Sequence, residues 1–339
     1  MQAILSAVHY HLPEQVLTNR QLAEEFPDWT IDRIEQKTGI RQRHIAGPGE
    51  CASDLGVEAA RKLFAAGAAR PEDIDFLLFC TQGPDYLLPT TACLVQERLG
   101  LPRHAGALDF NLGCSGFVYG LGLAKGLIET EQARNVLLIT AEAYSKFLHP
   151  SDRGVRTIFG DGAAATLLTG VNSAGPAPAI GPFVFGTDGR GAENLMVRAG
   201  AMRHPLGPGG PGRGEEPDGQ RQGHLRMNGP EIFNFALEVV PQAVGDLLGR
   251  AGKVVEDVDL YVFHQANRHM LEHLRKKLGI RPDRFALALE HCGNTVSSSI
   301  PIALREAFDA GQLRPGALVM LVGFGVGYSW AASLLRWML

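Results

Sequence analysis

The sequence predicts an α/β protein made of two similar halves. Residues 72–79 (EDIDFLLF) are echoed by residues 256–263 (EDVDLYVF), and each segment is typical of an acidic lead-in to a buried strand. A glycine-bearing turn follows in both halves, at Gly113 and at Gly293, and opens a helical pattern that leads to another apolar strand. This internal repeat indicates one strand–helix–strand–helix unit that occurs twice and packs about a pseudo-twofold axis.

The first half extends over residues 1–175. Residues 1–10 lack the basic region of a secretory signal and are too short in apolar length for one, so we expect them to form the first strand. The strand at 72–79 follows, and the helix after Gly113 leads to a buried strand at 135–140 (NVLLIT).

The second half, residues 176–339, begins with a segment that interrupts the repeat. Residues 204–219 are rich in glycine and proline and cannot sustain a helix or a strand, which favours a solvated connector over a substrate lid. A helix with Pro230 in its first turn comes next. The turn at Gly293 then leads to the last apolar strand, at 317–322 (ALVMLV).

The composition fits a compact intracellular enzyme, which we expect in the cytoplasm. The chain has 339 residues, 45% of them hydrophobic, and its net charge of −4 gives no general preference for nucleic acid or an anionic membrane. Its apolar runs are too short to span a bilayer. Five cysteines without a C-x-x-C pair argue against a disulfide framework and a structural zinc site, so we predict no metal.

One cysteine lies where nucleophilic chemistry is expected. Cys114 ends a strand-like run (DFNLGC) and directly precedes a helical pattern, where free backbone N–H groups and the helix dipole favour a thiolate. The alternative is a cysteine that only fills the core. We assign that role to the other four, Cys51, Cys80, Cys93 and Cys292.

Two polar residues occupy similar places elsewhere in the repeat. His264 follows the buried strand of the second half, and Asn294 lies in the second glycine-bearing turn. Each alone has an ordinary explanation, as a hydrogen-bonded core histidine or as a turn and capping residue. Because corresponding loops of a duplicated fold meet at one site, we expect both residues to face Cys114.

Several short motifs occur in a fixed order, namely residues 38–44 (TGIRQRH), 113–117 (GCSGF), 153–154 (RG), 159–164 (FGDGAA), 264–267 (HQAN), 293–295 (GNT) and 323–325 (GFG). With these motifs the chain resembles, nearly from end to end, the ketoacyl-acyl carrier protein synthase III family of the thiolase superfamily or a specialised-metabolism relative. The resemblance implies a homodimer with the thiolase fold, a duplicated αβαβα arrangement of five layers.

The resemblance also implies a decarboxylative Claisen condensation without a cofactor. Cys114 takes an acyl group from a thioester, and the backbone N–H groups of Cys114 and Val326 hold the oxyanion. A malonyl-type thioester on an acyl carrier protein then loses carbon dioxide, and N–H donors of His264 and Asn294 stabilise the enolate. Its attack on the acyl group gives a 3-oxoacyl thioester, as in fatty-acid or polyketide biosynthesis.

The entrance to the site departs from the family pattern. Arg33 and Lys37 stand where the family has a tryptophan and an arginine for the adenine end of coenzyme A. The resemblance places coenzyme A or phosphopantetheine binding at these two residues and at Arg153 and Asn267. An indole could stack on adenine only if Trp29 took the missing place. The acyl donor could be a coenzyme A thioester, an acyl carrier protein thioester, or both.

Leu88 and Phe324 are assigned to the acyl pocket by the same resemblance. Leu88 matches a position, often phenylalanine, that reaches across the dimer towards this pocket. A smaller residue there could admit a longer acyl chain, and simple packing in the interface is the alternative.

Other classes of protein fit less well. A degradative thiolase needs a second catalytic cysteine late in the chain, and none follows Cys292. A papain-like protease would lack the duplication, and a binding protein would need no reactive groups on convergent loops. The alternative function is an acyltransferase of the same fold that passes the acyl group to an alcohol or an amine without decarboxylation.

Overall fold

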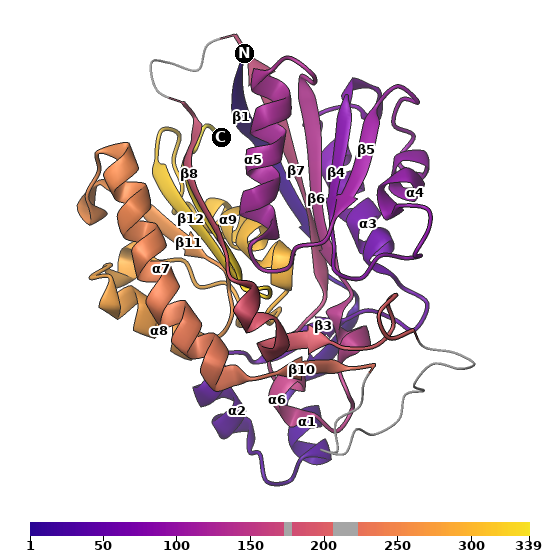
Figure 1. The fold of residues 1–339 in the computed structure, drawn as a ribbon, viewed down its shortest axis with the longest axis vertical. Coiled ribbons are helices and arrows are strands. Elements are labelled where there is room, and N and C mark those ends of the chain that lie inside the picture. Colours follow the sequence, from indigo (N-terminus) through magenta and orange to yellow (C-terminus); the bar gives the residue numbers. More distant parts are fainter. Residues whose placement is uncertain (173–177, 206–222) are drawn as a thin grey trace.

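The computed structural model describes residues 1–172, 178–205 and 223–339. Two β-sheets are separated by a central pair of helices and covered on their outer faces by further helices, which gives five layers (Figure 1). This is the duplicated α/β architecture that the internal repeat predicts.

The first sheet has the strand order β1-β7-β6-β4-β5. Strand β4 lies parallel to both β5 and β6, whereas β7 pairs antiparallel with β6 and with β1. The strands are β1 (Gln2–His11), β4 (Phe76–Cys80), β5 (Gly106–Phe110), β6 (Asn135–Glu142) and β7 (Gly162–Val171). The expected first strand and the expected strand from residue 135 are therefore confirmed.

The second sheet repeats this order as β11-β12-β13-β8. Strand β11 is parallel to β12, and a parallel bridge from Tyr261 to Phe285 occupies the side of β11 that corresponds to β5. The strands are β8 (Ile180–Thr187), β11 (Leu260–Phe263), β12 (Leu318–Gly325) and β13 (Ser329–Arg336). The echoed acidic segments thus lead into corresponding strands, β4 and β11.

Helices α5 (Gly116–Glu129) and α9 (Ser299–Asp309) form the central layer between the sheets. Helix α5 contacts strands of both sheets, and its small residues permit a close approach, since a Cβ atom on Gly120 would lie 2.6 Å from Leu138 Cδ1. The helix is apolar on most of its surface because it packs against both sheets, and Leu123 lies on the side that remains exposed. Large side chains buried here, such as Phe117, each stabilise the fold by about 1.5–3 kcal/mol.

The outer layers are formed by two helix pairs. Helices α3 (Ala52–Ala65) and α4 (Thr91–Arg98) cover the first sheet, and α7 (Gly229–Ala251) and α8 (Arg268–Lys277) cover the second. Asn228 caps α7, whose first turn contains the expected Pro230. The smaller elements are α1 (Asn19–Glu25), α2 (Ile31–Thr38), α6 (Arg153–Arg156), β2 (Gln15–Thr18), β3 (Gln42–Ile45), β9 (Leu195–Val197) and β10 (Leu225–Met227).

Two expectations about the chain's organisation lie wholly or mainly outside the described residues. The division between residues 1–175 and 176–339 falls within 173–177, and the glycine-rich and proline-rich segment at 204–219 is described only at its first two residues. Within the described ranges, no helix combines the length and the apolar character needed to cross a bilayer.

Candidate active site

Cys114 is buried between the end of β5 and the end of β12. It lies after β5 and two residues before α5 begins, and only 5% of its surface is exposed. Strand β12 ends against it, since a Cβ atom on Gly325 would lie 2.9 Å from Cys114 Sγ and one on Gly323 would lie 2.7 Å from the Cys114 carbonyl oxygen. The two glycines of the GFG motif therefore lie where a side chain would collide with Cys114.

The expectation of a resting thiolate is not supported by this environment. The pKa of the Cys114 thiol is raised to about 12, mainly by burial and secondly by the charge of the Glu142 carboxylate. Hydrogen bonds from the backbone N–H groups of Cys114 and Val326 lower the pKa but do not offset burial. The sequence pattern indicated the nearby helix but not the depth at which the thiol lies. Cys114 is therefore a neutral thiol before substrate binds.

His264 follows β11 and is a neutral imidazole. Its backbone N–H donates to the Val322 carbonyl (2.8 Å), which fixes the residue at the end of the second sheet. The side chain is 2% exposed, and burial lowers its pKa to about 3. Its ring packs against Phe324 with centroids 5.7 Å apart.

The hydroxyl of Ser299 pairs with the inner nitrogen of the imidazole. Ser299 Oγ lies 2.8 Å from His264 Nδ1, accepts from the N–H of Gln265 (3.3 Å) and donates to the Val296 carbonyl (2.9 Å). When the hydroxyl proton points to Val296, His264 Nδ1 carries the ring proton and Nε2 is an acceptor. When the hydroxyl turns to Nδ1, His264 Nε2 carries the proton and becomes a donor.

Asn294 is held in place by the first half of the chain. Its N–H donates to the Ile158 carbonyl (2.9 Å), and its own carbonyl accepts from Gly160 (3.0 Å). The side-chain oxygen Oδ1 accepts from the N–H of Val296 (2.9 Å), which leaves Nδ2 3.5 Å from His264 Nε2. The amide therefore presents its donor to the same space as the imidazole.

These side chains meet in one cavity of about 110 Å³. It is lined by Cys114, His264, Asn294, Asn267 and Phe324, so the structure brings together the three expected catalytic residues and two of the expected binding residues. The remaining lining is mostly apolar: Ile158, Phe159, Leu195, Met227, Gly229, Ile232, Ala266, Met270 and Gly325. A narrow apolar cavity with a few polar groups suits a thioester reaction from which water is excluded.

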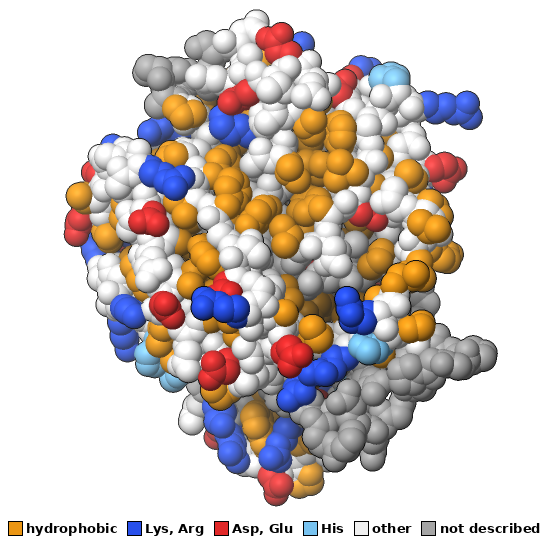
Figure 2. Space-filling model, in the orientation of Figure 1, with side chains coloured by type: hydrophobic (Ala, Val, Ile, Leu, Met, Phe, Trp, Pro, Cys, Tyr) orange, Lys and Arg blue, Asp and Glu red, His pale blue; other side chains and the backbone are white. Residues whose placement is uncertain are grey.

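The expected cationic residues of the entrance gather around one indole. Arg33, Lys37 and Arg153 lie over the Trp29 ring, with their charged groups 5.3, 5.2 and 5.7 Å from its centroid. Figure 2 shows Lys and Arg side chains concentrated at this end of the molecule, around α2 and α6. Asn267 lies apart from this group and caps α8, accepting from the Met270 N–H (2.9 Å).

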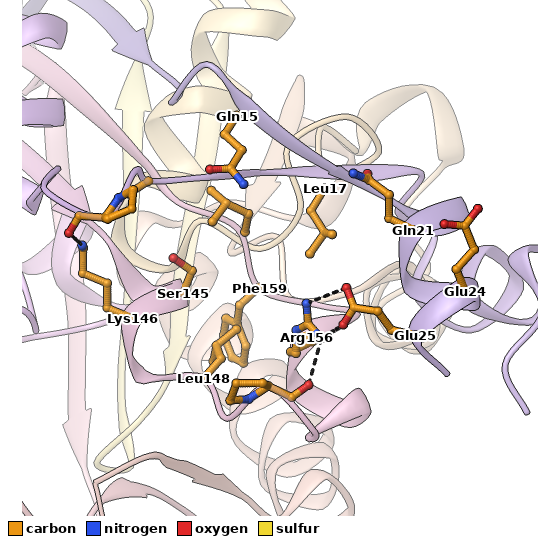
Figure 3. Close-up of a pocket in the computed structure, with 14 residues that line it drawn as sticks. Gln15, Leu17, Gln21, Glu24, Glu25, Ser145, Lys146, Leu148, Arg156 and Phe159 are labelled. Atoms are coloured by element: carbon orange, nitrogen blue, oxygen red, sulfur yellow. Dashed lines mark hydrogen bonds and ion pairs between the residues drawn. The ribbon is translucent and has the colours of Figure 1, made fainter. Parts of the chain in front are cut away.

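An open groove of about 740 Å³ lies beside the cavity, between α1, the β2–β3 pair and α6 (Figure 3). Phe159 lines both spaces and so separates them. The cations on the groove wall are already paired, since Arg156 binds Glu25 and Lys146 donates to two backbone carbonyls after β3 (Figure 3). The groove therefore has an apolar floor, at Leu148 and Phe159, below a polar rim whose cations Arg156 and Lys146 are paired.

Leu88 stands apart from the cavity. It is 86% exposed, next to the exposed side chains of Tyr86 and Leu87, and it does not line the Cys114 cavity among the described residues. Its assignment to the acyl pocket depends on a second subunit and stays a prediction.

Comparison with known proteins agrees with this geometry. Family models described as 3-oxoacyl-[acyl-carrier-protein] synthase III and as its C-terminal part match residues 108–189 and 248–337. The chain is 40% identical over 326 residues to the β-ketoacyl-[acyl-carrier-protein] synthase III of Symbiobacterium thermophilum, covering 96% of this chain and 95% of the relative.

Solved structures give the same answer. A crystal structure of a 3-oxoacyl-(acyl-carrier-protein) synthase III is 55% identical, with a TM-score of 0.95 and coverage of 99% of this chain and 100% of that one. The chain belongs to the 3-oxoacyl-acyl carrier protein synthase III family. The priming β-ketosynthase of the R1128 polyketide pathway is also similar, at 29% identity, with a TM-score of 0.87 and coverage of 99% and 96%.

As a member of this family, the protein has the thiolase fold and is a condensing enzyme of the acyltransferase class that forms 3-oxoacyl thioesters. The sequence resemblance to the synthase III family is therefore confirmed.

Sequence reasoning missed two polar residues of this synthase site. Ser299, which pairs with His264, lies in a run of three serines after Asn294, and nothing in the run distinguishes it from Ser297. Glu142 is a carboxyl at the end of the buried strand β6, and its place just after an apolar run was the available signal.

Proposed function

We propose that this synthase carries an acyl group on Cys114 and condenses it with a malonyl-type thioester. The supporting observation is that Cys114 from the first half and His264 and Asn294 from the second half line one cavity. Each half alone would have only part of this group. The proposed halves, residues 1–175 and 176–339, thus both contribute to the site.

The acylation step begins with a neutral thiol. Cys114 attacks the carbonyl carbon of an acyl thioester, and its proton passes to Nε2 of His264, which is an acceptor when Ser299 donates to Val296. The N–H groups of Cys114 and Val326, which already point at the sulfur, hold the tetrahedral oxyanion. When the C–S bond of the donor breaks, the departing thiolate takes the proton from His264. No net charge is left in the buried site.

The condensation step needs donors instead of an acceptor. As the malonyl group loses carbon dioxide, the bonding electrons form an enolate whose oxygen accepts from Asn294 Nδ2 and from His264 Nε2–H. The imidazole can supply that proton after the Ser299 hydroxyl turns towards Nδ1. The enolate carbon attacks the acyl carbonyl, the bond to Cys114 Sγ breaks, and the departing Cys114 thiolate takes up one proton from water, which is the proton that the overall decarboxylation consumes. Because both reacting carbons come from the substrates, this mechanism uses no cofactor.

The entrance group supports a carrier that bears phosphate. Arg33, Lys37 and Arg153 place three cations around the Trp29 ring, and a nucleotide presents both phosphates and a stacking base to such a group. Trp29 thus stands where an indole can replace the missing family tryptophan. We propose an acyl-coenzyme A donor at this group, with Asn267 beside the pantetheine arm and the malonyl group on an acyl carrier protein.

A homodimer is proposed from the apolar side chains that one chain leaves exposed. Leu108 on the edge strand β5, Leu123 on α5 and Phe185 on β8 are 38%, 46% and 48% exposed, and hydrophobic side chains gather around α5 in Figure 2. In a dimer, the exposed Leu88 would approach the partner's acyl pocket, of which Phe324 forms one wall. The five free cysteines fit a reducing compartment, so we place the enzyme in the cytoplasm.

Intact-protein mass spectrometry with a panel of acyl thioesters tests the proposal. A single acyl adduct on Cys114, followed by its loss and by release of carbon dioxide when malonyl thioester is added, is the expected result. Product formed with an alcohol or amine acceptor and without carbon dioxide release would instead support acyl transfer. Absence of any adduct on Cys114 across donors of different chain length would contradict both.

A further inference from the structure

Glu142 is a fully buried carboxyl that the proposed mechanism does not use. Glu142 is the last residue of β6 and is 0% exposed. Its side chain accepts hydrogen bonds from the hydroxyl of Ser297 to Oε1 (2.8 Å), from the N–H of Gln82 to Oε2 (3.1 Å) and from the hydroxyl of Thr81. Burying an ionisable group is costly unless it is neutral or well paired. Its position between β4 and the turn that carries Asn294 therefore needs a physical reason.

The Asn294 turn contains a strained residue that this contact helps to hold. Val296 has φ = +52°, in the left-handed region, where a β-branched side chain is unfavourable by about 1–3 kcal/mol. The Asn294 side chain holds this turn from one side. From the other side Ser297 binds Glu142, and the next serine, Ser298, donates to the Thr140 carbonyl (2.9 Å). The end of β6 therefore braces the turn that aims the Asn294 amide.

The same carboxyl is linked to the nucleophile through Gln82, whose N–H donates to Glu142 and whose side chain packs against Gly113, the residue before Cys114. The titratable groups that interact with it are Cys80 from β4, Cys114, Tyr144 and Asp161. Burial raises the pKa of Glu142 to about 8, and its negative charge is the second cause, after burial, of the raised pKa of Cys114. Below about pH 8 Glu142 is neutral and does not affect the ionisation of Cys114. Above about pH 8 Glu142 is a carboxylate, and its negative charge opposes the ionisation of Cys114.

We propose that Glu142 is a positioning residue with two effects: through Ser297 it holds the turn that aims Asn294, and through its charge it sets how readily Cys114 ionises. This inference rests on the proposed roles of Cys114 and Asn294. It explains why an ionisable group, and not an apolar one, occupies the end of β6 behind the site.

Three variants separate the two effects. Glu142→Gln removes the charge but keeps the length, because the amide oxygen can face Gln82 while the Ser297 hydroxyl accepts from the amide nitrogen. Glu142→Asp keeps the charge but is one methylene too short to reach both partners. Ser297→Ala removes the hydrogen bond that braces the Asn294 turn and leaves Glu142 in place.

Two measurements are made on each variant. Alkylation of Cys114 by iodoacetamide is followed from pH 6 to 11 by peptide mass spectrometry, and decarboxylation is followed by release of carbon dioxide from malonyl thioester.

The wild-type midpoint, near pH 12, lies above this range, so profiles are compared by the pH at which alkylation reaches one fixed rate. In Glu142→Gln this pH should fall by about one unit, which is about a tenfold faster reaction at a fixed pH well above 8, where wild-type Glu142 is charged. Below about pH 8 the two rates should agree. Ser297→Ala and Glu142→Asp should keep the wild-type alkylation profile and lose about tenfold or more in decarboxylation. Unfolding would also move the profile to lower pH, because an exposed thiol loses the effect of burial on its pKa, so the comparison uses variants whose thermal unfolding matches the wild type.

Two results would overturn the inference. One is a Glu142→Gln profile that superimposes on the wild-type profile, and the other is wild-type decarboxylation in Ser297→Ala. Failure of the proposed function would look different, because Cys114 in the wild-type enzyme would then form no acyl adduct at all.

Discussion

Replacement of Asn294 by aspartate separates the two half-reactions. In the wild-type enzyme Oδ1 accepts from the Val296 N–H (2.9 Å) and Nδ2 faces the cavity, 3.5 Å from His264 Nε2. Aspartate has the same shape and keeps the contact with Val296, but it has no donor for the enolate oxygen. Asn294→Ala loses the donor and the contact together, so it serves as the comparison variant.

The magnitude follows from the loss of one preorganised donor. Such a donor contributes about 2.7–4 kcal/mol to the transition state, or about 10²–10³ in rate. Asn294→Asp should lose at least this much decarboxylation, because a carboxylate also repels an enolate. Acylation of Cys114 uses the N–H groups of Cys114 and Val326 and should fall less than about tenfold. In Asn294→Ala the lost contact with Val296 should in addition lower stability by about 1 kcal/mol.

The assay measures both steps in the same preparation. Labelled carbon dioxide from malonyl thioester reports decarboxylation, the mass of the intact protein reports acylation, and thermal unfolding reports the fold. Equal losses in acylation and decarboxylation for Asn294→Asp, with unchanged unfolding, would refute the assignment and indicate that Asn294 activates Cys114 instead.

Three further predictions concern the nucleophile, the imidazole and the entrance. Cys114→Ala should abolish the acyl adduct. Alkylation of the wild-type thiol should become faster as the pH rises from 7 towards 11, because burial raises the pKa of Cys114 to about 12. A rate that is already constant from pH 7 would contradict this prediction. Ser299→Ala leaves Nδ1 of His264 without its hydroxyl partner and should slow condensation about tenfold or more, which steady-state kinetics would show. Acylation by coenzyme A donors should weaken with added salt and in Lys37→Ala, whereas salt-insensitive kinetics with a defect only in Trp29→Ala would indicate stacking alone.

The sequence by itself determined the architecture and the central residues of the site. The acidic lead-ins to β4 and β11, and the glycine turns before α5 and α9, are local patterns that recur in the same order in both halves. Local patterns of this kind fix strands and turns because they depend on neighbouring residues. A duplicated fold then brings equivalent loops together, which is why Cys114, His264 and Asn294 could be expected to meet before their contacts were seen.

Only the tertiary structure decided the state of these groups. The helix start next to Cys114 suggested a thiolate, but burial keeps the thiol neutral, and the charge that Glu142 from another strand acquires above about pH 8 opposes its ionisation. The protonation of the His264 imidazole was likewise decided by folding, because its pKa is lowered by burial and its partner Ser299 lies 35 residues away in the chain. Protonation depends on burial and on charges brought close by folding, and such contacts between distant residues leave no periodic signal in the sequence.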